Sequence, residues 1–205
     1  NTWGYNANGE LGIGNKTNQK NPIKVDSIST ITKIAAGKYS AYALGDDGNV
    51  YSFGYNRYGQ LGDGTSSTRT KPVLVTNLKD VVDIAVSSTY QAYALKSDGT
   101  VWGWGYSNNG ALTNVGGSIP KQLAGVDGEK MQNIASISAG YYSALAITNE
   151  GKVLAWGLNG YGQLGNGTTN NSSVPNYVKE SAENDFSDAL IAEMGRHYSV
   201  YAKED

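Results

Sequence analysis

The sequence predicts an all-β fold, a β-propeller built from four blade repeats of about 51 residues each. An aromatic residue followed by glycine recurs at intervals of 50, 51 and 52 residues, at Trp3, Phe53, Trp104 and Trp156. Twenty-seven glycines, 15 tyrosines and only 17% charged residues are typical of a turn-rich strand protein. Repeats of this length indicate a propeller or solenoid array.

The four repeats span residues 3–52, 53–103, 104–155 and 156–205, and together they form one domain or propeller fragment, residues 1–205. In each repeat, eight residues separate the aromatic residue from a loop leucine. These leucines are Leu11, Leu61, Leu112 and Leu164. A second interval is also constant: in every repeat, ten residues separate the residue at one turn from an acidic residue at the next turn. These turn residues are Gly37, Ser88, Gly140 and Gly195. The loop after each aromatic residue therefore tolerates no insertion.

Four short alternating runs in each repeat are expected to be strands, which is the content of one propeller blade. In the first repeat they are residues 23–25, 31–36, 39–44 and 50–53. Asp46-Asp47-Gly48 separates the last two runs, and an Asp-Gly pair between alternating runs is a hairpin signal. Each repeat thus predicts a hairpin with one further strand on either side.

The last repeat is the one place where a helix competes with a strand. Residues 181–194 contain helix formers, with Ser187 as a possible N-cap and Gly195 following. Aligned backwards from Gly195, residues 189–193 fall where the other repeats have their apolar strand. We expect a strand there, with the acidic residues 180–188 as a longer loop or a helical turn.

The charge balance argues against a nucleic-acid-binding protein. Sixteen basic and 18 acidic residues give a net charge of −2, without a run of Lys or Arg. Phosphate neutralisation needs a basic face, so a neutral, sugar-like or protein partner fits better, and no nucleic acid is expected. The absence of cysteine excludes disulfides and thiolate metal sites. No apolar run is long enough to span a bilayer, so membrane insertion is not expected.

Composition also bears weakly on localisation. Low charge with many Tyr, Asn and Thr residues is typical of bacterial surface or secreted proteins, which favours an extracellular or cell-surface location. The chain starts inside a repeat, with neither an initiator methionine nor the features of a signal peptide. We expect it to be part of a longer protein.

Two further motifs specify the kind of repeat. Gly-Gln-Leu-Gly occurs at residues 59–62 and 162–165, and Ala-Gly-x-Tyr-Ser at residues 36–40 and 139–143. With the aromatic-glycine pairs, they make the whole chain resemble the regulator of chromosome condensation repeat family. The resemblance implies a β-propeller, usually of about seven repeats, that serves as a platform for other macromolecules. Secreted bacterial members that bind and inhibit cell-wall-directed enzymes are the nearest functional analogy.

Four repeats leave two architectures open. They could close as a small four-blade ring, or they could be a segment or half of a larger propeller. Residues 198–203 and 1–3 are expected to be the two halves of one interrupted hairpin. These halves could pair within one chain, or between two chains in a homodimer that shares one propeller.

No constellation of residues favours catalysis or a metal. His197 is the only histidine, and it occupies the turn position of Tyr39, Tyr90 and Tyr142, so it is expected to be structural. Asp46-Asp47 lies at a hairpin turn, where Asp side chains bond their own backbone. No nucleophile elbow, phosphate loop or EF-hand spacing occurs. We therefore expect no enzyme, no cofactor and no metal.

Binding residues are expected in the loops that follow the aromatic-glycine pairs. Tyrosine supplies a large and rigid contact area, and asparagine supplies adaptable hydrogen bonds. The candidates are Tyr5, Asn6, Tyr55, Asn56, Tyr58, Tyr106, Asn108, Asn159 and Tyr161. The alternative is that these loops only pack on neighbouring blades. The in-register tryptophans Trp3, Trp104 and Trp156 are expected to pack between blades.

The sequence thus favours a non-enzymatic scaffold that binds a partner protein through Tyr and Asn residues on one rim. The alternative from another class is a cell-wall or glycan-binding surface module that uses the same aromatic residues. An enzyme is the least favoured reading, since it would need carboxylates brought together from different blades.

Overall fold

The computed structural model describes residues 1–26, 28 and 30–203, and its regular elements in that part are all β-strands. They form three four-stranded antiparallel sheets and two two-stranded ones. The four-stranded sheets are β3 (Ile31–Ala36), β4 (Ser40–Gly45), β5 (Val50–Gly54) and β6 (Arg69–Leu74); β7 (Val81–Val86), β8 (Gln91–Lys96), β9 (Val101–Gly105) and β10 (Gly117–Gln122); and β11 (Ile134–Ala139), β12 (Ser143–Thr148), β13 (Val153–Gly157) and β14 (Ser172–Tyr177). The predicted all-β fold, with four strands in each complete sheet, is confirmed.

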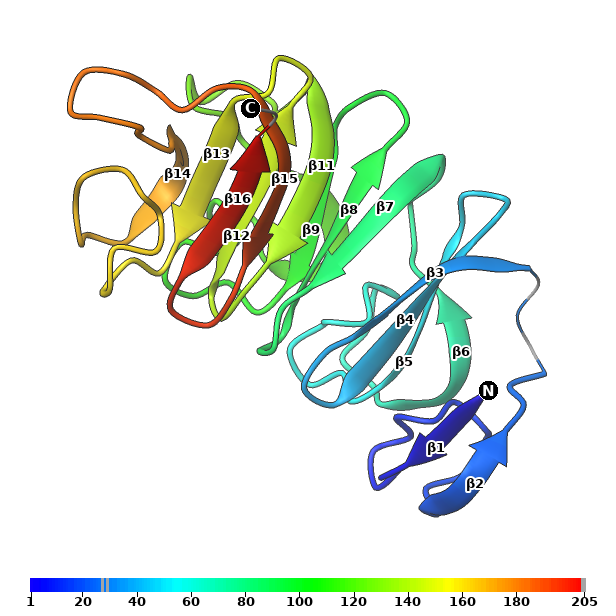
Figure 1. Ribbon diagram of the computed structural model, residues 1–205. Helices are drawn as coiled ribbons and strands as arrows, with labels where there is room; N and C mark the ends of the chain where they lie inside the picture. The colour runs from blue at the N-terminus through cyan, green and yellow to red at the C-terminus, as the bar shows by residue number, and fades with distance from the viewer. Residues whose placement is uncertain (27, 29, 204–205) are drawn as a thin grey trace.

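The two-stranded sheets lie at the two ends of the molecule. β1 (Thr2–Gly4) pairs with β2 (Gln19–Ile23), and β15 (Ala189–Met194) pairs with β16 (Ser199–Lys203). Figure 1 shows the sheets in an open, curved row, with the N- and C-termini at opposite ends. In the described part of the chain β16 pairs only with β15 and β1 only with β2, so the two halves of the expected hairpin are not joined within one chain.

The sheets pack face to face through apolar side chains. One core lies between the β3–β6 and β7–β10 sheets, a second between β7–β10 and β11–β14, and a third between β11–β14 and β15. Trp104 and Trp156 are completely buried in these cores, as expected from their register. Trp3, at the same register in β1, is 61% exposed because no described sheet covers that face.

The first three loops after an aromatic-glycine pair pack against the outer strand of the next sheet. A Cβ atom on Gly59 would lie 2.6 Å from the Cα atom of Ser118 in β10, and Gly110 approaches Ser173 in β14 equally closely. The N–H of Gly64 also donates to the carbonyl of Ser118 at 2.9 Å. These contacts explain the constant eight-residue interval, because an inserted residue would push the loop off its neighbour.

The competition in the last repeat is resolved in favour of a strand. Residues 189–194 form β15, whose side chains at Ala189, Ala192 and Met194 are buried against β12 and β13. Residues 180–188 form a loop held by an isolated bridge between Lys179 and Asp185. No helix long and apolar enough to cross a membrane occurs among the described residues.

Candidate binding surface

The antiparallel sheets divide their connections between two rims. One rim, here the aromatic rim, carries the turns 37–39, 87–90, 140–142 and 195–198. It also carries the loops 5–18, 55–68, 106–116 and 158–171. The other rim, here the acidic rim, carries the hairpin turns 46–49, 97–100 and 149–152 and the connections 75–80, 123–133 and 178–188. Antiparallel pairing places these two sets at opposite ends of the strands.

A hydrogen bond joins the turn and the loop of each four-stranded sheet on the aromatic rim. Gly105, at φ +99°, lies against the carbonyl oxygen of Tyr90, and a Cβ atom there would overlap that oxygen. The N–H of Tyr106 then donates to the same oxygen at 2.9 Å. Tyr55 and Tyr39 are joined in the same way at 2.8 Å. The aromatic-glycine pair therefore brings the turn tyrosine and the loop tyrosine of one sheet together.

Tyrosine rings of neighbouring sheets also contact one another. Tyr58 contacts Tyr90 and Tyr106 of the next sheet, with centroid separations of 4.7 and 4.8 Å, and Tyr55 at 6.3 Å. Tyr106 lies 6.3 Å from Tyr142 in the following sheet. Neighbouring rings at these distances and tilts stabilise each other by about 1 kcal/mol per pair. The contacts run without a break from the β3–β6 sheet to the β15–β16 sheet.

We call this set the aromatic row. Its members are Tyr39, Tyr55, Tyr58, Tyr90, Tyr106, Tyr141, Tyr142, Tyr161 and His197. Tyr161 at one end is 73% exposed, and Tyr39 and Tyr58 are more than a third exposed. Four predicted candidates, Tyr55, Tyr58, Tyr106 and Tyr161, lie in this row. Tyr5 stands beyond it, lining a shared hollow with Tyr39.

Three of the asparagines predicted to bind a partner are not surface residues. The prediction that they supply adaptable hydrogen bonds to a partner is therefore wrong. Asn6, Asn56 and Asn159 are completely buried. The Asn56 side chain accepts a hydrogen bond from the N–H of Leu61 at 2.9 Å and donates to the carbonyls of Thr65 and Ser67, both at 3.1 Å. A buried amide with all these bonds holds the loop together and has no capacity for a partner.

Asn108, the remaining asparagine candidate, is exposed, and its side-chain oxygen accepts a hydrogen bond from the N–H of the adjacent Asn109 at 2.9 Å. It lies one residue out of register, since Ser107 occupies the position of Asn56 in this repeat. It is therefore a suitable control for the buried asparagines.

Replacing Asn56 by alanine is expected to lower the free energy of unfolding by about 2–4 kcal/mol, because Leu61 N–H and two carbonyls lose their buried partner. Chemical denaturation measures this loss. The control Asn108→Ala should change the free energy by less than about 0.5 kcal/mol. Equal effects of the two substitutions would contradict the assignment of Asn56 as the centre of the loop.

Asp63 completes the same loop. It accepts hydrogen bonds from Asn56 at 3.0 Å and Thr65 at 2.8 Å, and pairs with Arg69 at 2.7 Å. Burial alone would raise the pKa of Asp63, but the bonds from Thr65, Arg69 and Asn56 outweigh it and hold the pKa below its ordinary value. The carboxylate is thus committed to its own loop.

The residues weighed for catalysis lie apart from one another. His197 lies in the aromatic row, 4.6 Å from the ring of Tyr161. Asp47 accepts from the side chain and the N–H of Asn49, bonds that lower its pKa and close the hairpin turn. Within residues 1–26, 28 and 30–203, no three His, Cys, Asp or Glu side chains gather as a metal site.

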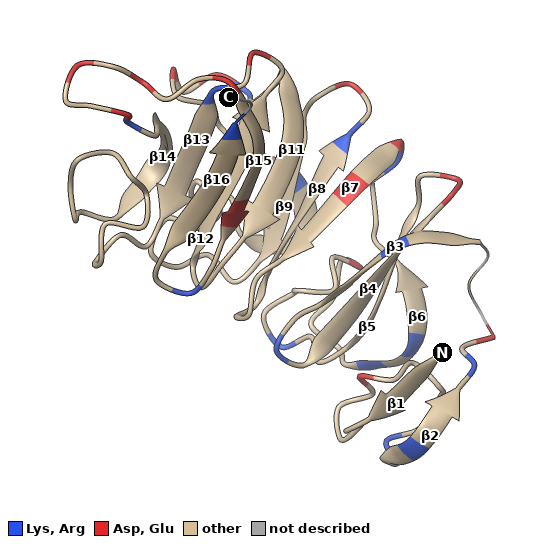
Figure 2. Ribbon diagram, in the orientation of Figure 1, with Lys and Arg blue, Asp and Glu red and all other residues tan. Residues whose placement is uncertain are grey.

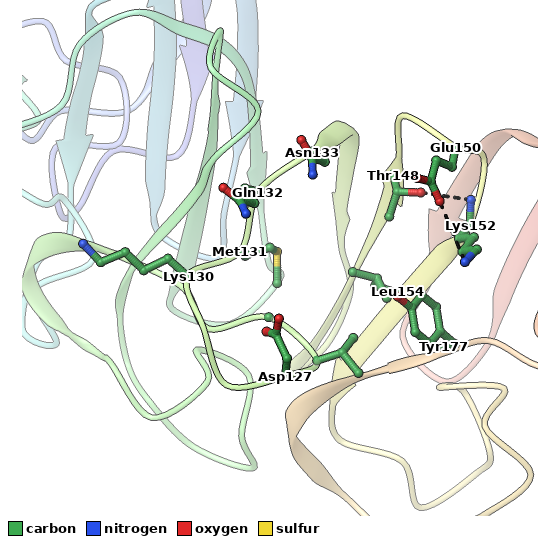
Figure 3. Close-up of a pocket in the computed structure, with 12 residues that line it drawn as sticks. Asp127, Lys130, Met131, Gln132, Asn133, Thr148, Glu150, Lys152, Leu154 and Tyr177 are labelled. Atoms are coloured by element: carbon green, nitrogen blue, oxygen red, sulfur yellow. Dashed lines mark hydrogen bonds and ion pairs between the residues drawn. The ribbon is translucent and has the colours of Figure 1, made fainter.

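Polar side chains line a hollow on the acidic rim, but their charged groups do not converge on one point. The hollow is lined by the 125–133 connection and by side chains of β12, β13 and β14 (Figure 3). Figure 3 shows Glu150 beside Lys152 on one side and Asp127 on the other, with Lys130 extending away. These groups do not point to a common atom, as a general acid and base would have to do.

Family comparisons agree with this architecture. A model of the regulator of chromosome condensation (RCC1) repeat matches residues 2–44, 47–93 and 150–201, and a second RCC1 repeat model matches residues 31–60 and 134–163. The chain belongs to the RCC1 repeat family. The resemblance of the sequence motifs to this family is thereby confirmed.

Relatives with RCC1 repeats are much longer proteins. The chain is 32% identical to the RCC1 domain-containing protein RUG3, mitochondrial, of Arabidopsis thaliana, over 89% of this chain and 43% of that protein. It is 32% identical to the human E3 ubiquitin-protein ligase HERC2, over 87% of this chain and 4% of that protein. It spans less than half the length of these relatives. Both are eukaryotic, so the expected bacterial character finds no support.

Solved structures of RCC1 proteins show the same fold. The structure of Kap60 bound to yeast RCC1 (Prp20) aligns with a TM-score of 0.73 at 24% identity, covering 99% of this chain and 50% of that one. The Saccharomyces cerevisiae Prp20p structure, described with its binding properties to Gsp1p and histones, aligns with a TM-score of 0.70 at 23% identity, covering 97% of this chain and 50% of that one. These two alignments show that the chain shares the fold of the RCC1 structures.

Several members of the aromatic row were not among the predicted binding residues. The sequence predicts Tyr39, Tyr90 and Tyr142 only as structural rings of the turn, and it assigns Tyr141 no binding role. The signal was available in the ten-residue interval, since it places these turns at the same end of the sheet as the loop tyrosines.

Proposed function

We propose that this chain is a non-enzymatic protein-interaction scaffold whose binding surface is the aromatic row. The supporting observation is the unbroken ring-to-ring contact from Tyr39 to Tyr161 along one rim, with its end rings open to solvent. Tyrosine is enriched at the centres of protein interfaces, because its ring buries apolar area while its hydroxyl keeps a hydrogen bond. The rigid sheets hold these rings in place before a partner arrives, which lowers the entropy cost of binding.

A site-specific crosslink identifies the partner. A photoreactive amino acid in place of Tyr161, at the exposed end of the row, is expected to crosslink a protein. The same amino acid in place of Val126, which is 39% exposed on the acidic rim, should not capture that protein. Capture from both positions would mean that contact is not confined to the aromatic rim.

The double substitution Tyr58→Ala/Tyr90→Ala is expected to weaken binding of the identified partner by about 30-fold or more, because it removes two central rings of the row. The measurement is the affinity of the purified chain for that partner. Tyr177→Ala, which removes an aromatic ring beside Lys152 on the acidic rim, is the matched control and should leave the affinity unchanged.

Folding is separated from binding by thermal unfolding of each variant. If Tyr58→Ala/Tyr90→Ala melts far below the parent chain, Tyr161→Ala takes its place, since that ring is largely exposed. Unchanged affinity in both variants would reject the row as the interface. Binding of a glycan in place of a protein, lost in the same variants, would establish the alternative function instead.

Two further expectations stay proposals. A ring completed between two chains would pair β1 of one copy with β16 of the other, and the mass of the 21.7 kDa chain in solution would reveal such a dimer. The extracellular or cell-surface location rests on composition alone, and fractionation of the source cells would test it.

A further inference from the structure

Charge is distributed unevenly between the two rims. Figure 2 shows most acidic residues in the connections at one end of the strands, whereas basic residues occur at both ends and include turns at the opposite end. On the acidic rim the acidic side chains are Asp46, Asp47, Asp80, Asp98, Asp127, Glu129, Glu150, Glu180, Glu183, Asp185 and Asp188. The turns and loops of the aromatic rim contain only Glu10 and Asp63. The chain is therefore close to neutral as a whole but polarised from rim to rim.

Both acidic residues of the aromatic rim already bond to residues close to them in the sequence. The Glu10 carboxylate accepts from the N–H and the side-chain amide of Asn8, both at 2.8 Å. Asp63 pairs with Arg69. Neither carboxylate pairs with Lys38, Arg57 or Arg196, the basic residues beside the aromatic row, so these three residues set the field along the row.

Basic residues accompany the aromatic row at three places. The Lys38 ammonium lies 5.6 and 5.5 Å from the ring centroids of Tyr39 and Tyr90, and the neighbouring Tyr90 side chain holds the pKa of Lys38 above its ordinary value. The Arg196 guanidinium lies 4.6 Å from the Tyr141 ring. Arg57 is exposed between Tyr55 and Tyr58 in the loop of the β3–β6 sheet.

We propose that the aromatic row binds an acidic, extended polypeptide segment, an inference that rests on the proposed function. Carboxylates of the segment pair with Lys38, Arg57 and Arg196, and its apolar side chains lie against the tyrosine rings. The shape of the site supports an extended occupant, because the rings form a strip that crosses successive sheets rather than a closed pocket. Complementary charge along such a strip selects the partner and accelerates its association.

The ring geometry favours a polypeptide over single-stranded nucleic acid. Bases bind on aromatic faces that stand free and parallel to them. Here each ring faces its neighbour at a tilt, 38° for Tyr58 and Tyr90 and 48° for Tyr58 and Tyr106. Those faces are already used, whereas ring edges and hydroxyls remain for peptide groups and apolar side chains.

The test measures binding of a fluorescein-labelled peptide in which glutamate alternates with valine, a pattern that favours an extended chain. The whole chain should bind this peptide, more weakly as salt rises, and should not bind the same peptide with lysine in place of glutamate. Lys38→Glu, Arg57→Glu and Arg196→Glu should each weaken binding by about threefold to tenfold. Lys130→Glu, an exposed position on the acidic rim, is the matched control and should have no effect.

The outcomes separate this inference from the proposed function. If the partner protein is lost by Tyr58→Ala/Tyr90→Ala but kept by the triple charge reversal, the row binds protein and the acidic-segment inference is wrong. Tighter binding of a thymidine oligonucleotide than of the glutamate peptide would also overturn it. Self-association of the parent chain that the triple reversal abolishes would assign the row to the acidic rim of a second copy instead. Loss of peptide and partner together in the triple variant supports the inference.

Discussion

Gly105→Ala is expected to lower the free energy of unfolding by about 3–5 kcal/mol, which corresponds to a fall in melting temperature of roughly 6–20 °C for a chain of this size. Two costs combine. The residue has φ +99°, a conformation that side-chain-bearing residues rarely adopt, and the new Cβ atom would overlap the carbonyl oxygen of Tyr90. Relief of the overlap must separate the β7–β8 turn from the loop and break the hydrogen bond from Tyr106 to Tyr90.

Gly4 provides a matched control at the same position of the repeat. Its φ is +102°, almost that of Gly105, yet no atom lies within 4 Å of a Cβ placed there. Gly4→Ala should therefore show only the backbone cost, about 1–2 kcal/mol. Denaturation of the two variants side by side isolates the contact with Tyr90, and equal losses would mean that this contact contributes nothing.

Close backbone contacts such as that between Gly105 and Tyr90 explain why constant spacings in the sequence predict so much of the fold. The aromatic-glycine pair, the eight-residue loop and the ten-residue hairpin each correspond to a contact between fixed backbone atoms, so their lengths cannot vary. Closure of the ring was not predictable in this way. Pairing of the end strands depends on long-range geometry between sheets, and β1 and β16 carry the same local pattern whether or not they meet.

At the candidate site, the hydrogen-bonding capacity of asparagine led to a wrong prediction, because three of the four candidate asparagines are buried. An Asn beside a loop tyrosine suggests a surface hydrogen-bonding group, but Asn6, Asn56 and Asn159 each stand three residues after the aromatic residue of an aromatic-glycine pair. That fixed spacing is the mark of a structural residue, the argument that correctly assigned His197 to the turn. Exposure of the tyrosines has no such signal, because it depends on which loops from neighbouring sheets come together.

Trp104→Ala is expected to lower the free energy of unfolding by about 3–5 kcal/mol, because it opens a cavity between the β3–β6 and β7–β10 sheets. The ring is completely buried and packs against Gly62 and Tyr42. Its Nε1 donates to the carbonyl oxygen of Gln60 at 2.8 Å, across the boundary between sheets. The aromatic rim above this boundary should loosen as well, so partner affinity is expected to fall together with stability.

Two further variants divide this loss into packing and hydrogen bonding. Trp104→Phe should cost less, since Phe53 fills the same position of another repeat and the Gln60 carbonyl keeps its bond from the Tyr42 hydroxyl. Trp3→Ala removes the same residue type from the same register in β1, where the side chain is mostly exposed, and should change stability by less than about 1 kcal/mol. If Trp3→Ala is as damaging as Trp104→Ala, the face of β1 must be covered in solution, and the open row of sheets would be completed by a partner strand on that side.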